Sequence, residues 1–546
     1  MVIIPAVRIA IAQLNLTIAD LEGAARAIRS AAQAAIEQGA QFLVTPELAA
    51  FGGYPLRDLL DRRELVDRQW RMVQQLAVGL PLPVLVGCVE PLGSGPGPTL
   101  ANALVLLDGG RVAATYHKRL LPTYDVFDER RHFRPGTQPQ IVSIAGKRVG
   151  LSVCEDIWTE DSSGIAYAQD PVADLIGRCD VVINASASPW HFGKAAVRHR
   201  LLQAVAARVG APIVYCNQVG GQDELLFDGD SAAIAADGSW LGAAPRWRSG
   251  VTMVDLKQRR TPPAELHTLD DLHAALVTGI RDYCTKTRQK HLVLGLSGGI
   301  DSALVATLGV DALGADAVTG LLMPGPYSSP GSISDAEALA ANLGIRAHIL
   351  PIGGMYEAAL MTLHPVFAGT VANVAEENLQ SRLRGNLVMA AANKLGAMAL
   401  TTGNKSELAC GYCTIYGDMN GGLAPIGDVY KTTVWDLSRR INAVAGQVRI
   451  PVASIEKAPS AELRPNQTDQ DSLPPYEVLD RILIRWLENQ DSRDAIVAGG
   501  EDPLIVDRVI RLVEVAEFKR RQAPPALRVT RKAFGIGRRI PIARAF

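Results

Sequence analysis

Short apolar runs alternate with helical stretches through the first half of the chain. Residues 7–16, VRIAIAQLNL, and 83–88, PVLVGC, are apolar almost throughout, and residues 21–39, LEGAARAIRSAAQAAIEQG, carry apolar side chains at helical spacing. Strands that read as nearly continuous apolar runs are typical of sheets covered on both faces. The pattern therefore predicts a layered α/β domain over residues 1–257.

The same alternation resumes after a change of character. Residues 258–270 hold a charge run and paired prolines and so predict a linker. Beyond them, apolar runs at 291–296 and 316–324 again precede helical stretches, which predicts a second α/β domain over residues 271–546, Rossmann-like and with a parallel sheet. A chain of 546 residues exceeds what one hydrophobic core usually supports, which agrees with two domains.

Charge and cysteine usage exclude several classes of protein. The formal net charge of -1 argues against a general binder of polyanions, and we expect no nucleic-acid partner. The first residues enter a strand pattern directly and no window holds about 18 uninterrupted apolar residues, so we expect a soluble, cytoplasmic protein without a membrane segment. The seven cysteines are scattered and odd in number, which is typical of reduced thiols.

One turn in the second domain has the chemistry of a phosphate site. The string SGGIDS, residues 297–302, follows an apolar strand and opens a helical stretch. Its two glycines let successive backbone N–H groups face an anion at a helix N-terminus, and its serine hydroxyls add donors. Asp301 beside phosphates requires a cation such as Mg²⁺. A glycine pair after a strand can also be a mere tight turn, but the complete string favours phosphate binding.

This string resembles the signature of the N-type ATP pyrophosphatases, which transfer AMP from ATP to an acceptor and release pyrophosphate. Residues 401–437, TTGNKSELACGYCTIYGDMNGGLAPIGDVYKTTVWDL, resemble the corresponding block of the NAD synthetases within that group. The resemblance implies ATP as a substrate. The residues that it assigns to ATP are Ser297, Gly298, Gly299, Asp301, Ser302, Thr402 and Lys431.

The same resemblance implies a metal site and a second nucleotide site. Asp301 and Glu407 are the implied Mg²⁺ ligands, and Asp418 is implied to lie beside the nicotinate end of deamido-NAD. Residues 377–386, ENLQSRLRGN, look like the helix that binds this dinucleotide. The candidates on it are Asn378, Arg382 and Arg384, although two arginines at this spacing are equally typical of a solvated helix face.

Cys410 and Cys413 form a C-x-x-C pair, which signals redox or metal chemistry in some proteins. A structural Zn²⁺ site would need a second pair of ligands, and the sequence offers none nearby. We therefore expect two packed thiols.

Three segments of the first domain each carry one reactive side chain at or after the end of an apolar strand: Glu47, Lys118 and Cys154. A thiol is mostly protonated at neutral pH, so it needs a base such as Glu47, and Lys118 can stabilise an oxyanion. Each residue alone has an ordinary structural explanation. Their order and surroundings resemble the nitrilase/amidase superfamily, which implies an α/β-β/α layered sandwich and catalysis by these three residues.

A nitrilase-like amidase followed by an ATP pyrophosphatase resembles the glutamine-dependent NAD synthetases over essentially the whole chain. The implied substrates are glutamine, ATP and deamido-NAD, with ammonia passing between the two sites, and a homo-oligomer is expected. After Glu47 this chain has one residue more than the family pattern before Gly-Tyr-Pro, which leaves the placement of Tyr54 open. The residues implied to shape the glutamine pocket are Tyr124, Phe127, Glu129, Glu155 and Ser186.

Two other readings of the sequence stay open. In some enzymes a domain of the type predicted for the second half of this chain adenylates a base in RNA. The basic run at residues 518–543 would then contact nucleic acid. Alternatively, the first domain is an inactive module and free ammonia is the nitrogen donor. The dinucleotide-like segments argue against the first reading and the complete Glu, Lys, Cys set against the second.

Overall fold

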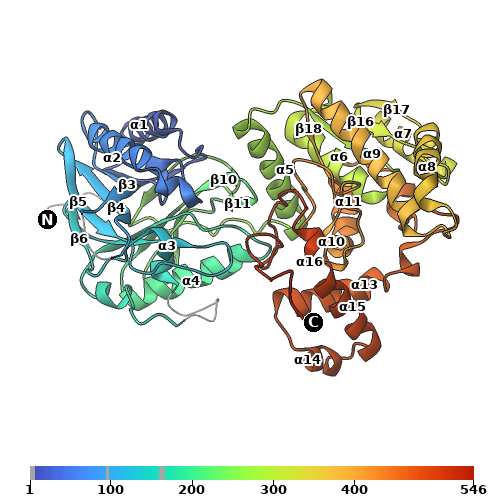
Figure 1. Cartoon of the computed structure of the whole chain (residues 1–546). Helices are drawn as coiled ribbons and strands as arrows, with labels where there is room; N and C mark the ends of the chain where they lie inside the picture. The colour runs from blue at the N-terminus through green and yellow to red at the C-terminus, as the bar shows by residue number, and fades with distance from the viewer. Residues whose placement is uncertain (1–6, 94–96, 159–165, 546) are drawn as a thin grey trace. The chain divides into compact units, whose positions relative to one another are not determined.

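The structure is a computed structural model that describes residues 7–93, 97–158 and 166–545. The chain divides into two compact units, Met1–Leu266 and His267–Phe546. The division falls inside the segment 258–270 in which the sequence predicts a linker, and the first helix of the second unit, α5, already begins at Thr268. Each unit is described by itself (Figure 1).

The first unit contains two six-stranded sheets. Both combine parallel central pairs with antiparallel edges, as in β1–β2 and β1–β14 of the first sheet and β8–β9 and β6–β7 of the second. In spatial order the first sheet holds β14 (Gly250–Asp255), β1 (Arg8–Gln13), β2 (Phe42–Val44), β3 (Val84–Pro91), β4 (Leu100–Asp108) and β5 (Arg111–His117). The second sheet holds β13 (Trp240–Ala243), β12 (Ala232–Ile234), β9 (Ile213–Asn217), β8 (Val181–Ser186), β7 (Lys147–Val153) and β6 (Ile141–Ile144). A separate hairpin joins β10 (Val219–Gln222) to β11 (Leu225–Asp228).

The two sheets pack face to face. Ile9 and Val44 of the first sheet share one buried cluster with Leu151 and Ile183 of the second, and all four are at most 1% exposed. Helices cover the outer faces: α1 (Leu21–Glu37) and α2 (Arg63–Ala77) pack on the first sheet, and α4 (Lys194–Val209) packs on the second. In Figure 1, α1 and α2 lie above the strands of this unit and α4 below them. The predicted α/β-β/α sandwich is confirmed.

The second unit is built on a four-stranded parallel sheet in the order β17, β16, β15, β18. Its strands are β15 (Leu292–Gly295), β16 (Val318–Leu322), β17 (Arg346–Ile349) and β18 (Met398–Ala399). The order reverses between β15 and β18, and ligands of such sheets bind at the carboxyl ends of the strands where this happens. The SGGIDS turn follows β15 at that edge. The predicted Rossmann-like parallel sheet is confirmed.

Helices connect these strands and build a second core beyond them. The helices near the sheet are α5 (Thr268–Lys286), α6 (Ile300–Leu313), α7 (Pro330–Leu343), α8 (Gly353–Phe367) and α9 (Val374–Leu395). Those that follow are α10 (Lys405–Cys410), α11 (Lys431–Ala445), α12 (Val452–Glu456), α13 (Tyr476–Leu483), α14 (Arg493–Ala498), α15 (Pro503–Val515) and α16 (Glu517–Arg520). None of the helices in the described ranges combines the length and the apolar character needed to cross a bilayer.

Candidate functional site

Glu47, Lys118 and Cys154 come from three different strand ends of the first unit, as predicted. Glu47 follows β2, Lys118 follows β5, and Cys154 begins a short 3-10 turn directly after β7. The Lys118 Nζ donates hydrogen bonds of 2.7 Å to Glu47 Oε1 and to Glu129 Oε1. Glu129 opens the short helix α3 (Glu129–His132), and all three side chains of this ion cluster are at most 3% exposed.

The electrostatics of this cluster keep the Cys154 thiol protonated and the Lys118 amine charged. Burial raises the pKa of Cys154 well above its usual value, and the neighbouring Glu47 carboxylate raises it further, so the thiol is protonated at neutral pH. Burial lowers the pKa of Lys118, but the carboxylates of Glu129 and Glu47 outweigh it and hold that pKa well above its ordinary range. The site therefore contains a neutral nucleophile that needs a base and a lysine that stays charged.

Asn102 is a member of this site that the sequence did not indicate. Its Nδ2 donates to Glu47 Oε1 at 2.7 Å and to Glu129 Oε2 at 3.4 Å, while the Ala187 N–H donates to Glu47 Oε2 at 3.0 Å. Both oxygens of Glu47 thus accept hydrogen bonds and the carboxylate is held in one orientation. Asn102 is the third residue of β4, LANALVLLD, and a polar residue inside this apolar run was the signal that the sequence offered.

Asp156 ties the nucleophile turn to the lysine segment, and its role was likewise not predicted. Its Oδ2 accepts from the Val153 N–H at 2.9 Å, and its Oδ1 accepts from the Leu120 N–H at 2.9 Å. Cys154 itself has φ of 42°, in the left-handed region that few residues other than glycine adopt. The buried carboxylate thus supports a strained turn that presents the thiol.

The predicted glutamine-pocket residues are largely brought together. Tyr124 OH donates to both Glu155 oxygens, at 3.0 and 3.2 Å, and Phe127 packs edge-on against Tyr124 with ring centres 5.4 Å apart. Glu129 belongs to the lysine cluster. Ser186 is not part of this group of contacts. It is fully buried at the end of β8, and its Oγ donates to Asn184 on the same strand at 2.7 Å.

Tyr54, whose placement was open, lies beside this aromatic pair. Its ring centre is 5.7 Å from that of Phe127, and its N–H donates to Gln218 Oε1 at 2.9 Å. Tyr167, which the sequence did not indicate, donates from its hydroxyl to Glu155 Oε1 at 2.8 Å. The Glu155 carboxylate is therefore held by two phenols.

The SGGIDS turn of the second unit forms a compact nest. The Ser297 N–H donates to Ser302 Oγ at 3.2 Å, and the Gly299 N–H donates to Ser297 Oγ at 3.2 Å. Gly298 has φ of 76°, and a Cβ there would lie 2.2 Å from the carbonyl oxygen of Ser332. Only glycine fits at this point between the turn and α7.

Two carboxylates and a lysine lie beside the nest. Lys431 Nζ donates to Asp301 Oδ2 and lies 3.6 Å from Glu407 Oε1, and Asn404 Nδ2 donates to Asp301 Oδ1 at 3.0 Å. Burial raises the pKa of Glu407 to about 8, and the Asp301 carboxylate adds to the rise. Burial lowers the pKa of Lys431, but Asp301 and Glu407 outweigh it and raise that pKa.

The donors Asp301 and Glu407 suit Mg²⁺, which needs few protein ligands, better than a metal ion bound by protein side chains alone. In the described parts of the chain no three His, Cys, Asp or Glu side chains gather as metal ligands. Mg²⁺ usually binds through one or two carboxylates together with water and substrate phosphates, and Asp301 and Glu407 beside a phosphate nest offer that combination.

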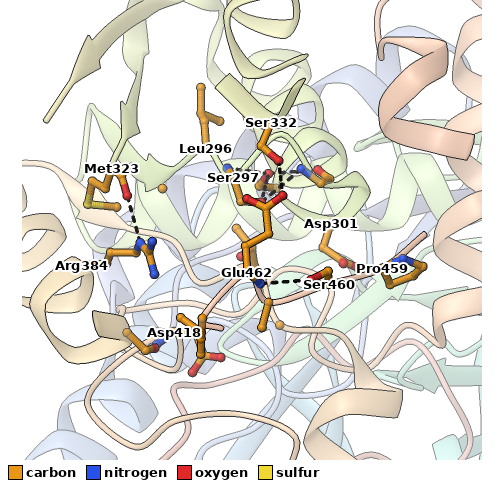
Figure 2. A pocket seen from close by; sticks show the side chains of 18 of the residues that line it. Leu296, Ser297, Asp301, Met323, Ser332, Arg384, Asp418, Pro459, Ser460 and Glu462 are labelled. Atoms are coloured by element: carbon orange, nitrogen blue, oxygen red, sulfur yellow. Dashed lines mark hydrogen bonds between the residues drawn. The ribbon is translucent and has the colours of Figure 1, made fainter. Parts of the chain in front are cut away.

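These groups line a cavity of about 300 Å³. Figure 2 shows Ser297, Asp301, Arg384 and Asp418 around it. Arg384 Nε donates to the Met323 carbonyl at 3.0 Å. The predicted residues that line the cavity are Ser297, Gly299, Asp301, Ser302, Thr402, Lys431, Glu407, Arg384 and Asp418.

Three predicted residues lie outside the cavity wall. Gly298 is packed against α7, as described above. Asn378 Oδ1 accepts from Thr414 Oγ1 at 2.8 Å, and the exposed Arg382 donates from Nε to the Ile415 carbonyl at 3.3 Å. Asn378 and Arg382 therefore hold the loop after α10, and their contact with a dinucleotide stays a prediction.

Asp418 opens onto the cavity although protein surrounds it. Its Oδ1 accepts from the Thr414 N–H at 2.6 Å, and its N–H donates to Ser381 Oγ at 3.0 Å. Burial raises the pKa of this carboxyl group to about 6.

A polar segment after α12 supplies residues that the sequence did not indicate. Glu462 accepts from Ser329 Oγ at 2.9 Å and Ser332 Oγ at 2.6 Å, and Lys457 Nζ donates to the same Glu462 oxygen at 3.1 Å. Figure 2 shows Ser297, Ser332 and Glu462 pointing toward one another. The stretch KAPSAELRP has no strand or helix periodicity, so only the fold brings it to the cavity.

Two family profiles match the chain. That of the NAD synthase family matches residues 272–523, and that of the carbon-nitrogen hydrolase family matches residues 8–264. The glutamine-dependent NAD(+) synthetase of Synechocystis sp. is 45% identical over 98% of this chain and 99% of its own length. That of Thermotoga maritima is 38% identical over 99% of each chain.

Solved structures give the same relationship. The glutamine-dependent NAD+ synthetase of Acinetobacter baumannii, in complex with ADP, is 34% identical, with a TM-score of 0.77 over 98% of each chain. The enzyme of that name from Cytophaga hutchinsonii is 22% identical and has the same fold, with a TM-score of 0.84 over 99% of this chain and 98% of its own.

Proposed function

The chain belongs to the family of glutamine-dependent NAD(+) synthetases, and on this premise we propose that it makes NAD from deamido-NAD, ATP and glutamine. Glutamine and water give glutamate and ammonia in the first unit. ATP, deamido-NAD and ammonia give AMP, pyrophosphate and NAD in the second. The observation that supports this most strongly is that each unit contains a site suited to its half of the reaction: the Glu47–Lys118–Cys154 cluster and the nest at Ser297–Ser302.

In the first half-reaction the Cys154 sulfur attacks the side-chain carbonyl carbon of glutamine. Because the thiol is protonated at rest, Glu47 takes its proton and then returns it to the departing ammonia. The tetrahedral oxyanion lies beside the permanently charged Lys118. Water then attacks the thioester carbon, which releases glutamate and the free thiol.

In the second half-reaction the nicotinate carboxylate of deamido-NAD attacks the α-phosphorus of ATP, and pyrophosphate leaves. The nest at Ser297–Ser302 and Lys431 would stabilise the charge of that leaving group. Held by Asp301 and Glu407, Mg²⁺ would neutralise the remaining phosphate charge. Ammonia then attacks the acyl carbon of the adenylate, the bond to AMP breaks, and one proton is released.

The test is product analysis with glutamine carrying ¹⁵N in its amide, together with ATP, Mg²⁺ and deamido-NAD. We expect NAD one mass unit heavier, with glutamate, AMP and pyrophosphate in equal amounts. NAD formed only with added ammonium salts would mean that the first unit is inactive. If no NAD forms from either nitrogen source, the proposal is wrong. The family resemblance also leads us to propose a homo-oligomer, which light scattering would measure.

A further inference from the structure

A second, much smaller cavity adjoins the substrate cavity of the synthetase unit. Its volume is about 20 Å³, against about 300 Å³ for the larger one. Four residues line both cavities: Thr401, Gly403, Glu407 and Asp418. The small cavity therefore lies directly behind the wall that carries Asp418 and Glu407.

The rest of its wall is mostly apolar. Leu408, Met419 and Ala424 are at most 7% exposed, and the thiol of Cys413 and the turn at Ala523–Pro524 complete the lining. Cys413 is the second cysteine of the C-x-x-C pair, and neither the proposed chemistry nor a metal site uses it. The cavity thus has one polar side, which faces the substrates, and one apolar side.

This wall is built by contacts between segments about 100 residues apart. Lys519 Nζ donates to the carbonyl oxygens of Gly411 and Cys413 at 2.7 and 2.8 Å. The Ala424 N–H donates to the Pro525 carbonyl at 2.8 Å, and a parallel bridge joins Ala424 to Ala526. The C-terminal segment is therefore fixed against the loop after α10, and the cavity it closes has a defined size.

The size admits one small molecule. A cavity needs about 10–15 Å³ of this kind of volume to hold one water, and ammonia is about as large as water. Asp418 and Glu407, which line both cavities, carry carboxyl oxygens that can accept hydrogen bonds from ammonia. A methyl group added to the nitrogen would have to enter the space walled by Cys413, Met419 and Ala523.

We infer that this cavity receives the ammonia that attacks the adenylate, and that Cys413 and the Ala523–Pro524 turn exclude larger amines from it. The inference rests on the proposed function and names the residues that set its selectivity for the nitrogen donor. Cys413 would then act through the size of its side chain and not through redox or metal chemistry.

The first test fills the cavity with Ala523→Leu. The KM for ammonium in ammonia-supported NAD synthesis should rise by about tenfold or more, since small steric differences in such pockets change specificity by that order. Exchange of labelled pyrophosphate into ATP, which requires deamido-NAD but no ammonia, should be unchanged and shows that the variant is folded. Unchanged exchange with an unchanged KM for ammonium would overturn the inference.

The second test enlarges the cavity with Cys413→Ala and offers methylamine in place of ammonium. The ratio of kcat/KM for methylamine to that for ammonium should rise about tenfold, with the N-methyl amide detected by mass spectrometry. Cys410→Ala is the matched control, because this buried thiol lies three residues away and does not line the cavity.

If Cys413→Ala and Cys410→Ala have the same ratio of kcat/KM for methylamine to kcat/KM for ammonium, the inference is wrong. If Ala523→Leu loses pyrophosphate exchange, it is no longer informative, and this comparison of the two cysteine variants is then the test. The wild-type chain separates this result from the proposed function. If it makes no NAD from ammonium, ATP and deamido-NAD, the proposed function fails and the inference fails with it. If it makes NAD but the variants behave like wild type, only the inference is wrong.

Discussion

Lys118 and Glu47 form an ion pair with 2.7 Å between Nζ and Oε1, and neither side chain is more than 1% exposed. A buried pair of this kind is stable only as a unit, since removing one partner leaves an uncompensated charge in a low dielectric. The same cation also holds Glu129, so three ionisable side chains share one buried space beside the Cys154 thiol.

Lys118→Met should therefore cost both activity and stability. It leaves the buried Glu47 carboxylate without its cation, so we expect the free energy of unfolding to fall by about 3–5 kcal/mol and glutamine hydrolysis to be lost. Denaturant unfolding and glutamate release measure the two effects. Lys147→Met, a lysine in the same unit outside this cluster, is the control, and a Lys118→Met variant as stable as that control would contradict the ion-pair argument.

Cys154→Ala should separate the two half-reactions. Only the thioester step needs the thiol, so glutamine-supported NAD synthesis should fall on the order of 10⁴-fold or more, whereas ammonia-supported synthesis stays near wild type. Steady-state NAD formation with each nitrogen source measures this. Cys179→Ala removes another buried thiol of the same unit and should leave both activities intact. Full glutamine-dependent activity in Cys154→Ala would refute the assignment of the nucleophile.

Asp301→Asn should abolish synthesis from either nitrogen source. Loss of a group that only supports a metal ligand costs about 10- to 100-fold, and loss of a direct ligand should cost at least as much. Glutamate release in the first unit should continue. The decisive measurement is the Mg²⁺ concentration required for half-maximal ammonia-supported turnover, compared with Asp316→Asn, an exposed aspartate of the same unit. An unchanged Mg²⁺ requirement would rule out the metal role.

Gly298→Ala should weaken ATP binding because a Cβ would meet the Ser332 carbonyl oxygen at 2.2 Å and displace the nest. Gly344→Ala is the matched control: this glycine also has a left-handed φ, of 67°, but nothing lies within 4 Å of the added Cβ. Both changes force an alanine into a left-handed backbone conformation, which costs about 1–2 kcal/mol of stability. Only Gly298→Ala should also raise the KM for ATP. Equal effects on that KM would mean that strain, not the close contact, matters.

Asp418 should make the stability of the protein depend on pH between about 4 and 6. Burial raises its pKa from 3.8 to about 6, so between these values the folded state binds more protons than the unfolded state. Stability from this group is then present below pH 3.8 and is lost as the pH rises through 6. The Tm of Asp418→Asn minus that of wild type should increase across this window and level off above it. A difference that is flat from pH 4 to 7 would show that the carboxyl group has an ordinary pKa.

Several features of the two sites could be predicted because they are local in the chain. The turn from Ser297 to Ser302 is contiguous, and an apolar strand, two glycines and a helical stretch specify its geometry wherever they occur. Glu47, Lys118 and Cys154 could each be placed at a strand end from the apolar run before it. Glu47 and Lys118 follow strands of one sheet and Cys154 follows a strand of the other, so the family resemblance, and not strand pairing, indicated that they meet. Ser186 shows how far such local prediction reaches: its position at a strand end could be predicted, but not that its hydroxyl donates to Asn184.

What the sequence by itself determined was the two α/β units, the strand ends that carry the reactive groups and the phosphate nest, because periodicity and turn chemistry act over a few residues. Only the tertiary structure decided that Asn102 donates to Glu47, that Lys118 also holds Glu129, and that Glu462 accepts from Ser332 of α7. It alone placed Ala523 and Pro524 in the wall of the same cavity as Cys413. These contacts join segments distant in the chain, and their partners are chosen by the packing of whole layers, which no local pattern of apolar and polar residues records.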